Sequence, residues 1–434
     1  MRSHPVPVGL VLLLLALLLL PLWATFAAGP AIGDSDDAKK DTPPPAPEAE
    51  KKPEWEVPRW LTREVKRHVR KGAGRRERAA AMQTPAYVAA IDPALAWLEK
   101  SQQESGRWSS EMEGRKGCDV GVTGLAVLAF LSNGETIRSG PHDKTVLNGV
   151  KWLMTTQDKD GFFGSNVEVP TSHKTYGHAI ATLALAEAYG MTGSVYLKTA
   201  AQRGVDCIYK MQNPYLAWRY GYRPGDNDSS VTAWMVHALS SAKAAGLTVS
   251  QEAFDGARAW IEKATEPEYG RVGYTSRGSG PARPPGLMDK FPADRSESLT
   301  AMGVFARMLT GGDPRKSETI GKGIDLIRKV PLQWDESGGR IDMIYWHFGA
   351  LAVHQAGGDL WKTWETAMKT QIADRQVKEG EQKGSWPPVG VWGGEGGRVY
   401  STAILTLTLE TYRRYPVLFE KGKKSGRRKY RNLR

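Results

Sequence analysis

The chain has 434 residues, of which 41% are hydrophobic and 24% are charged, and it carries a net charge of +12. This length and hydrophobic content are ample for a large buried core and exclude a chain that is disordered throughout. The positive charge is concentrated in two short segments, so it does not describe the surface of the folded part.

Residues 1–28 have the pattern of an export signal. An apolar run fills 8–20 after Arg2, and Thr25 and Ala27 form a small-x-small cleavage site. The apolar stretch continues weakly to residue 28, which gives about the 20 residues that a bilayer span needs. The sequence therefore predicts export to the periplasm or cell envelope, with a signal peptide that is cleaved or one that stays as a membrane anchor.

Three further segments outside the predicted core are strongly polar. Residues 29–58 are rich in Pro, Ala and charge, which predicts a disordered linker. A basic helical segment is expected at 59–82, and the tail at 421–434 has eight Lys or Arg and no acid. Both basic segments favour binding to an anionic membrane or envelope surface. The alternative is that they only keep the chain soluble. Nucleic acid is not an expected partner, because an export signal argues against it and no aromatic or Gly-rich motif accompanies the charge.

One pattern recurs at a fixed interval of 55 residues. The markers at this interval are Gln102, Gln157 and Gln212, followed by Trp108, Phe163 and Trp218. A shared interval across independent markers indicates a repeat architecture. We expect each Gln to satisfy unpaired backbone groups where a helix ends, a Gly to make the turn, and the aromatic ring to pack over the junction between units.

Each repeat contains two helices of different character. The first is amphipathic, with apolar residues at three- and four-residue steps, and is expected at 93–103, 147–157, 203–212, 254–264, 318–330 and 360–376. The second is apolar on nearly all sides and is expected at 121–131, 177–189, 231–242, 298–309, 343–356 and 399–415. No segment has a convincing strand pattern. Six hairpins over 90–415, without a polar capping repeat at either end, predict a closed ring rather than an open solenoid.

The Gln-to-aromatic units resemble the QW repeats of squalene and terpenoid cyclases and of prenyltransferase β subunits. Segments 218–234, 342–364 and 384–415 look more narrowly like the exported squalene-cyclase-like repeat proteins of planctomycete-type bacteria. The resemblance covers 90–415 and implies an all-α (α/α)6 toroid whose inner helices line a central pit. Because this ring carries cyclisation, protein prenylation and simple binding, the resemblance implies a fold more than a function.

The motifs that catalysis needs in this family are incomplete here. The resemblance implies an Asp-x-Asp-Asp acid motif before Thr-Ala, and aligning Thr232-Ala233 with that pair places Ser230 and Val231 where the last two Asp belong. The zinc ligands of prenyltransferases are matched only faintly, by Asp342 and His347. We therefore expect no metal and no cofactor. The incomplete motifs favour binding over catalysis without deciding between them.

Polar residues near the N-terminal ends of the inner helices are the candidate site. Those expected to line the pit and bind a ligand are Asp119, His173, His178, Glu297, Tyr345, His347 and Tyr400. Helix N-termini also supply unpaired N–H groups, which suit an anionic or carbonyl-bearing ligand. Asp226 and Asp228 are the weak candidates for a catalytic acid, and helix capping explains them at least as well.

The sequence thus predicts a binding or scaffolding module of the cell envelope. Its central pit would take a hydrophobic, lipid-like ligand such as an isoprenoid, or a polymer-derived ligand. The alternative is a diverged terpenoid cyclase or prenyltransferase-type enzyme that uses Asp226 or Asp228 as its acid.

Overall fold

A computed structural model of the chain describes residues 86–110 and 118–414. Four predicted segments lie outside the described residues, namely the signal or anchor at 1–28, the linker at 29–58, the basic segment at 59–82 and the tail at 421–434.

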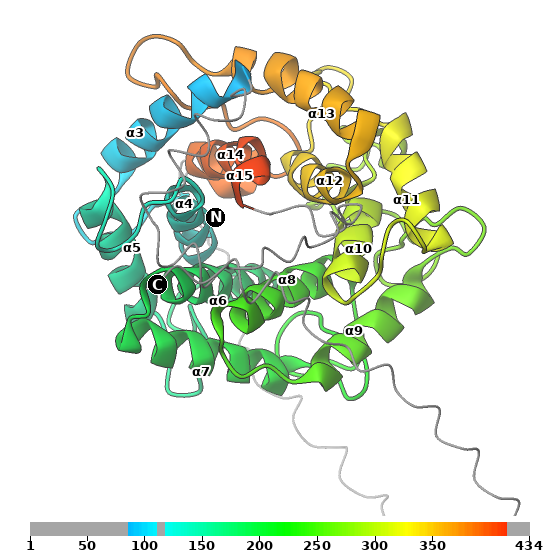
Figure 1. Cartoon of the computed structure of the whole chain (residues 1–434), viewed down its shortest axis with the longest axis horizontal. Helices are drawn as coiled ribbons and strands as arrows, with labels where there is room; N and C mark the ends of the chain where they lie inside the picture. Colours follow the sequence, from blue (N-terminus) through cyan, green and yellow to red (C-terminus); the bar gives the residue numbers. More distant parts are fainter. Residues whose placement is uncertain (1–85, 111–117, 415–434) are drawn as a thin grey trace, which may run out of the picture. The chain divides into compact units, whose positions relative to one another are not determined.

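In residues 86–110 and 118–414, twelve long helices form two concentric rings (Figure 1). The outer ring contains α3 (Ile91–Ser101), α5 (Asp143–Thr155), α7 (Val195–Met211), α9 (Gln251–Ala264), α11 (Glu318–Lys329) and α13 (Gly358–Gln371). The inner ring contains α4 (Asp119–Ser132), α6 (Thr171–Thr192), α8 (Ser229–Ala245), α10 (Ser298–Leu309), α12 (Met343–Ala356) and α14 (Gly393–Leu409). Shorter helical turns are η1 (Ala86–Ala90), η2 (Ala293–Arg295), η3 (Ala373–Arg375) and α15 (Thr411–Arg414). The described residues contain only isolated bridges and no strand, so the predicted (α/α)6 toroid is confirmed.

The two rings differ in burial as their sequences predict. Every residue of α4 is buried, because its side chains are apolar or small on all sides. In α11 the buried residues are Ile320, Gly323, Ile324 and Ile327, which recur at three- and four-residue steps along one face. None of the helices in 86–110 and 118–414 is long and apolar enough to cross a bilayer.

Both rings close. Each inner helix contacts the next in chain order, and α14 packs against α4, which completes the inner circle. At the same junction α14 also packs against α3, and η3 contacts η1. The last hairpin is therefore joined to the first, as a toroid requires and an open solenoid does not.

The recurring glutamines join neighbouring units. Nε2 of Gln102 donates to the carbonyl of Gly106 at 2.9 Å, in its own turn, and to the carbonyl of Thr145 at 3.0 Å, in the next outer helix. The same two bonds recur at Gln157, Gln212 and Gln376. Because Gln376 reaches the carbonyl of Ala90, it joins the sixth unit to the first. The expected role of the glutamine in satisfying backbone groups is seen in all four units.

The glycine of the turn is required for two reasons. Gly106 has a φ of 90°, which lies in the region that favours glycine. A Cβ at this position would lie 2.5 Å from the carbonyl oxygen of Asn148 in the next outer helix. The turn can therefore neither adopt its backbone angles nor approach its neighbour with a larger residue.

The aromatic residues of the repeat are structural. Trp108 is fully buried and its indole N–H donates to the carbonyl of Leu98 at 2.7 Å. Trp218 and Trp386 make the equivalent bond to the ends of their own outer helices, each at 2.8 Å. Gly149 of the next outer helix lies against the Trp108 ring, so this ring packs over the junction between adjacent units, as the sequence predicts.

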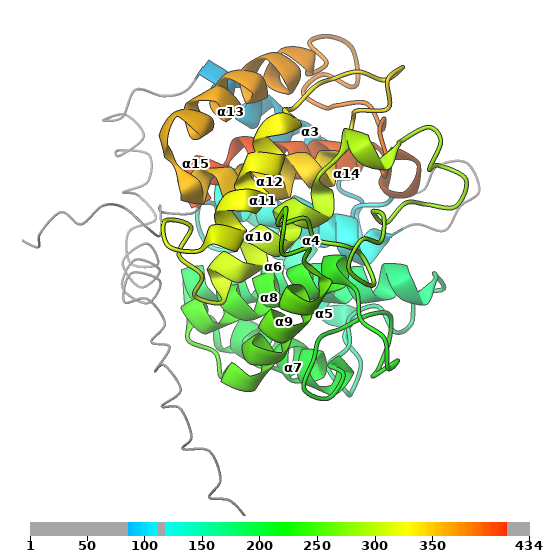
Figure 2. The same cartoon turned by 90° about the vertical axis from the view of Figure 1, so that its right-hand side faces the viewer.

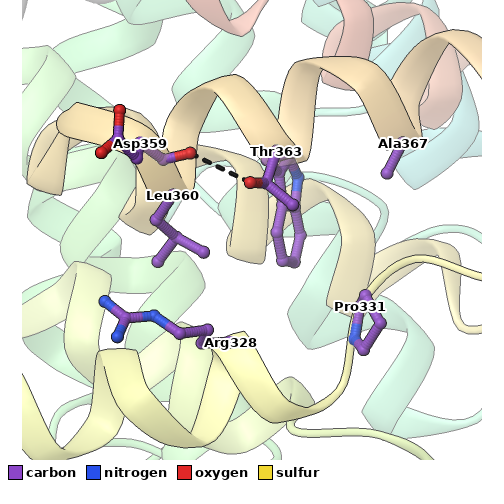
Figure 3. Close-up of a pocket in the computed structure, with 7 residues that line it drawn as sticks. Arg328, Pro331, Asp359, Leu360, Thr363 and Ala367 are labelled. Carbon is purple, nitrogen blue, oxygen red and sulfur yellow. Dashed lines mark hydrogen bonds between the residues drawn. The ribbon is translucent and has the colours of Figure 1, made fainter.

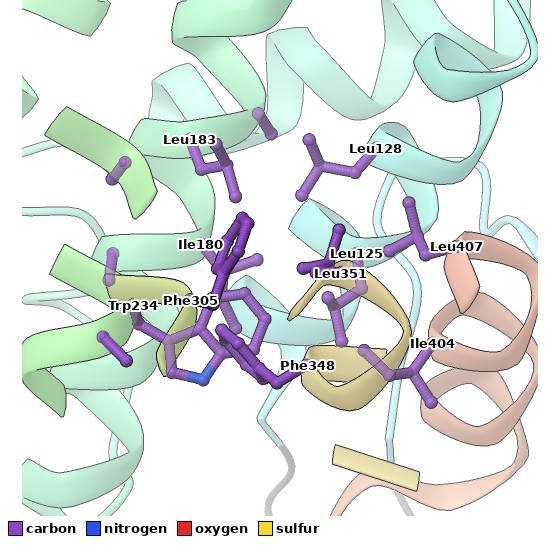
Figure 4. Close-up of a cluster of buried hydrophobic side chains, with 14 of the residues drawn as sticks. Leu125, Leu128, Ile180, Leu183, Trp234, Phe305, Phe348, Leu351, Ile404 and Leu407 are labelled. Atoms are coloured by element: carbon purple, nitrogen blue, oxygen red, sulfur yellow. The ribbon is translucent and has the colours of Figure 1, made fainter. Parts of the chain in front are cut away.

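Apolar side chains from all six inner helices point toward the middle of the ring (Figure 4). The labelled members of this cluster are Leu125, Leu128, Ile180, Leu183, Trp234, Phe305, Phe348, Leu351, Ile404 and Leu407. The Trp234 ring lies edge to face with Phe348 at 5.0 Å, which joins α8 to α12 across the ring. The inner ring therefore encloses a strongly apolar centre.

Candidate functional site

The connections that precede the inner helices lie on one face of the toroid, and α15 lies on the other (Figure 2). Asp228 is on the first of these faces, as the N-cap of α8. Its Oδ1 accepts from the backbone N–H of Val231 at 2.7 Å and from Oγ of Ser230 at 3.2 Å. Its Oδ2 is buried and has no hydrogen-bond partner among the described residues. Burial raises the pKa of Asp228 from 3.8 to about 7, because the charged form loses its solvation.

Arg219 is the nearest cation to this carboxyl group. Its Nε lies 4.0 Å from Oδ2 of Asp228, which is too far for a hydrogen bond. Like Oδ2, Nε is buried with no partner within the described part of the chain. The other side of the guanidinium donates to Asp226, whose side chain is exposed. The Nε–H donor of Arg219 and the Oδ2 acceptor of Asp228 are thus neighbours that form no hydrogen bond with each other.

Three tyrosines complete the surroundings of Asp228. The hydroxyl of Tyr176, in α6, is hydrogen-bonded to Oγ of Ser230, and the hydroxyls of Tyr220 and Tyr274 are bonded to each other. The guanidinium of Arg219 lies over the Tyr220 and Tyr274 rings, 5.4 and 5.8 Å from their centroids. Burial, followed by the charge of Asp228, raises the pKa of Tyr176 and of Tyr274. These two phenols therefore stay protonated at neutral pH.

We call this group the Asp228 cluster; it comprises Tyr176, Arg219, Tyr220, Asp228, Ser230 and Tyr274.

Asp342 is the N-cap of another inner helix, α12, and its carboxylate is fully paired. Oδ1 accepts from the backbone N–H of Tyr345 at 3.0 Å, and Oδ2 accepts from Oγ of Ser296 at 2.8 Å. Arg283, in the Gly- and Pro-rich loop before α10, places its guanidinium 3.2 Å from Oδ2 in a buried ion pair. The hydroxyl of Tyr400 is buried without a partner in the described ranges, and burial, followed by the charge of Asp342, raises its pKa.

Two of the predicted pit residues are satisfied by neighbouring arginines. Asp119 lies 2.9 Å from Arg107 and also accepts from the backbone N–H of Ser110. Glu297 lies 2.7 Å from Arg271. Both carboxylates hold the start of an inner helix against the preceding loop, and these contacts account for them without a ligand.

Tyr345 and His178 make contacts toward the outer layer of the toroid. The hydroxyl of Tyr345 donates to the carbonyl of Ile327, near the end of α11, at 3.2 Å. The ring of His178 stacks on Phe162 at 4.8 Å, and its Nδ1 accepts from the backbone N–H of Phe163 at 3.2 Å. Burial lowers the pKa of His178 to about 3, so this imidazole is neutral.

The other two predicted histidines lie apart from each other. Nε2 of His173, near the start of α6, is 3.7 Å from Glu395. His347 stacks on Trp234 across the ring, with 6.4 Å between ring centroids. Burial lowers the pKa of His347 to about 3. The structure therefore does not bring His173, His178 and His347 together as one polar group.

The chain resembles solved structures without matching a described family. No protein-family model matches it, and no curated protein matches it. One similar structure is a variant of a type II terpene cyclase from Scytonema in complex with merosterolic acid A, at 13% identity and a TM-score of 0.51, covering 75% of this chain and 97% of that chain. Another is an inactive α-1,6-mannanase variant of Salegentibacter sp. in complex with α-1,6-mannotriose, at 9% identity and a TM-score of 0.52, covering 75% and 99%. Cellobiose 2-epimerase from Spirochaeta thermophila has 16% identity and a TM-score of 0.52, covering 82% and 98%.

These likenesses show the fold alone. The chain is an (α/α)6 toroid. Because terpene cyclase and sugar-acting enzymes share this architecture at low identity, the fold does not select a ligand. Membership of the QW-repeat family stays a prediction.

The sequence reasoning missed most of the Asp228 cluster. Arg219 and Tyr220 lie within the segment 218–234 that carried the family resemblance, but they were not selected as site residues. A usable signal was present in the spacing. Tyr220 and Tyr274 are 54 residues apart, as are Tyr176 and Ser230, and both pairs form hydrogen bonds between adjacent units. An interval close to that of the repeat therefore marks side chains that meet.

Neither the cavity in the outer ring nor any cluster of metal-ligating side chains provides a competing site among the described residues. A cavity of about 410 Å³ lies between α11 and α13 in the outer ring (Figure 3). Its polar groups have local partners: the Arg328 guanidinium pairs with Asp325, and the Thr363 hydroxyl donates to the carbonyl of Asp359. In 86–110 and 118–414, no three His, Cys, Asp or Glu side chains gather as a metal site.

Proposed function

We propose that this toroid is a binding module that takes a small organic ligand, isoprenoid or polymer-derived, at the Asp228 cluster. One observation carries the proposal: Oδ2 of Asp228 and Nε of Arg219 are both buried, lie 4.0 Å apart as a loose ion pair, and both lack a hydrogen-bond partner among the residues described. Leaving a buried polar group unpaired costs roughly 1–3 kcal/mol, and more when the group is charged. Such a cost at a helix N-terminus, beside half-buried aromatic rings, is typical of a site that is completed by a ligand.

The proposal is supported by the contrast with other carboxylates at the starts of inner helices. Asp342, Asp119 and Glu297 occupy comparable places in the ring, and each has an arginine within 3.2 Å. Asp228 is the capping acid whose nearest guanidinium nitrogen remains at 4.0 Å.

A second candidate function is acid–base catalysis by Asp228. The observation that favours it is the pKa of about 7, at which a carboxyl group can give or take a proton near neutral pH. Asp226 is less suited to this role than Asp228, because it is exposed and paired with Arg219. The substrate of such an enzyme would bind at the Asp228 cluster, so both proposed functions use the same site.

A binding screen followed by a turnover assay separates the two. We would measure binding of detergent-solubilised isoprenoids and of neutral and acidic oligosaccharides by isothermal titration calorimetry, and then product formation by mass spectrometry. The binding function predicts an affinity that falls in Asp228→Asn, with no conversion of the bound compound. Conversion that is lost in Asp228→Asn establishes the enzyme instead, and no binding by any compound refutes both.

Export and attachment to an envelope surface are also proposals, since they depend on residues 1–28, 59–82 and 421–434. Cell fractionation tests them. The protein should be found in the envelope fraction, and removal of 421–434 should increase its release by a salt wash, because the basic tail supplies attraction to anionic surfaces. Recovery of the full-length protein in the cytoplasmic fraction would contradict export.

A further inference from the structure

We propose that the group recognised at the Asp228 cluster is a hydroxyl of a neutral polyhydroxylated ligand, such as a sugar unit, which bridges Oδ2 of Asp228 and Nε of Arg219. This inference rests on the proposed binding function and narrows it to one ligand chemistry.

The distance between the two atoms sets the size of the bridging group. Hydrogen bonds of this type span about 2.7–3.2 Å. The 4.0 Å gap between Nε of Arg219 and Oδ2 of Asp228 is therefore too long for a direct bond. It is short enough for one oxygen atom to lie within hydrogen-bond distance of both. The distance between the two atoms therefore matches a bridge through a single small polar group and is too short for two heavy atoms in line.

The chemistry of the two atoms sets the kind of group. Nε–H of Arg219 is only a donor, and a carboxylate oxygen of Asp228 is only an acceptor. The bridging group must therefore accept one hydrogen bond and donate another, which a hydroxyl does. When Asp228 is protonated, a hydroxyl can accept from it as well, but this bond is weaker than one donated to the carboxylate, so the bridge is strongest above the pKa.

Other ligand classes fit less well. A hydrocarbon satisfies neither atom and leaves both buried groups unpaired. A carboxylate or phosphate would bring a negative charge against Asp228, while the positive charge of Arg219 is already paired with Asp226. An ammonium group has no lone pair to accept from Nε–H. A water molecule has the same donor and acceptor properties as a hydroxyl, so a ligand hydroxyl competes with water for this position.

The surroundings of the bridge also suit a sugar. Tyr176, Tyr220 and Tyr274 are each half-buried, so they offer ring faces together with hydroxyl groups. Such side chains are amphipathic, which matches a molecule with apolar C–H faces and polar edges. The side chain of Arg219 is 28% exposed, whereas Asp228 and both bridging atoms are buried, so a ligand must approach from the exposed side of the guanidinium.

The test uses the purified folded chain and three variants. The probes are an array of neutral oligosaccharides that includes α-1,6-mannotriose and cellobiose, and squalene in detergent as an isoprenoid without a hydroxyl group. Asp228→Asn replaces the accepting oxygen by a donor. Arg219→Lys keeps the charge but removes Nε–H. Asp255→Asn is the matched control, because it neutralises an exposed carboxylate that pairs with Arg258 in the outer helix α9 and leaves Arg219 and Asp228 unchanged.

We expect a neutral oligosaccharide to bind, with an affinity that falls about tenfold or more in Asp228→Asn and in Arg219→Lys, which corresponds to the loss of one buried hydrogen bond to a charged group. Asp255→Asn should change the affinity by less than about threefold, because this exposed pair lies outside the cluster. Circular dichroism of each variant verifies that it is folded.

The remaining outcomes distinguish this inference from the proposed function. Squalene binding without any oligosaccharide binding overturns the hydroxyl bridge and leaves the binding function standing. Oligosaccharide binding that is equal in Asp228→Asn and in the unchanged protein overturns the assignment to this cluster. Binding of neither class overturns both.

Discussion

Asp228 and Asp342 hold the same position at the N-cap of an inner helix, but they differ in what faces their second carboxylate oxygen. Oδ2 of Asp342 accepts a hydrogen bond from Ser296 and pairs with the buried guanidinium of Arg283, whereas Oδ2 of Asp228 has no hydrogen-bond partner in the described part of the chain and lies 4.0 Å from Arg219. Both side chains are almost completely buried. The carboxylate of Asp342 is therefore fully paired within the fold. The carboxylate of Asp228 is buried without a hydrogen bond to Oδ2, which lowers the stability of the fold.

Replacing Asp228 by Asn should stabilise the folded chain at pH 8. The folded-state pKa of about 7 lies above the reference value of 3.8, so the native state binds more protons than the unfolded state between these values. The free energy of unfolding therefore falls as the pH rises through this window. Asn keeps an oxygen that can accept from Val231 and carries no buried charge.

We expect a gain on the order of 2 kcal/mol at pH 8 that shrinks as the pH approaches 4. Urea denaturation at several pH values measures it. An Asp228→Asn variant that is less stable than the unchanged chain at pH 8 would show that the carboxylate is better solvated than its burial implies.

Replacing Asp342 by Asn should have the opposite effect. The substitution leaves the guanidinium of Arg283 buried beside a neutral amide, and breaking a buried pair in this way costs about 3–5 kcal/mol. The loss should be seen at neutral pH in the same urea experiment. The double variant that adds Arg283→Met should recover part of the loss, because it removes the unpaired charge. A loss below about 1 kcal/mol in Asp342→Asn would mean that solvent reaches this pair.

Gly384→Ala should weaken the closure of the toroid. Gly384 has a φ of 93°, and a Cβ there would lie 2.7 Å from the carbonyl carbon of Pro93 in the first outer helix. We expect a loss of more than about 2 kcal/mol, from backbone strain and from displacement of the junction. The matched control is Gly394→Ala, since a Cβ at Gly394 meets nothing within 4 Å. Equal stability of the two variants in thermal unfolding would refute the role of Gly384 in ring closure.

The buried histidines should make the fold sensitive to acid. Burial lowers the pKa of His178 and His347 to about 3 and that of His354 to about 4, against a reference of 6.5. Between these values the unfolded state binds protons that the native state does not, so stability falls as the pH drops below about 6.5. His347→Phe keeps an aromatic ring beside Trp234 and cannot be charged. Its stability relative to the unchanged chain should therefore improve from pH 7 to pH 4, and a constant difference would contradict this.

The repeat interval was a reliable guide to the fold because the same bonds recur at it. Gln102 and Gln157 make the same pair of backbone contacts, so their spacing reports a physical unit. The residues of the candidate site could be predicted less well from the repeat interval. Asp342 is paired because Arg283, from an irregular loop outside the repeat, lies 3.2 Å from it. Asp228 has no arginine nearer than 4.0 Å among the described residues. Tyr345 follows Asp342 closely in sequence but turns toward α11, because successive helical positions face different sides.

The affinity for a hydroxyl-bearing ligand should rise with pH through about 7. A ligand hydroxyl that donates to Oδ2 of Asp228 stabilises the carboxylate, so binding lowers the pKa of this group and releases protons below pH 7. The charged groups near Asp228 are Arg219 and its partner Asp226, and the phenols of Tyr176 and Tyr274 stay protonated. Calorimetry at pH 6.5 in two buffers of different ionisation enthalpy should therefore detect proton release for the unchanged chain. In Asp228→Asn the residual affinity should be independent of pH, and an equal pH dependence in this variant would assign the proton to another group.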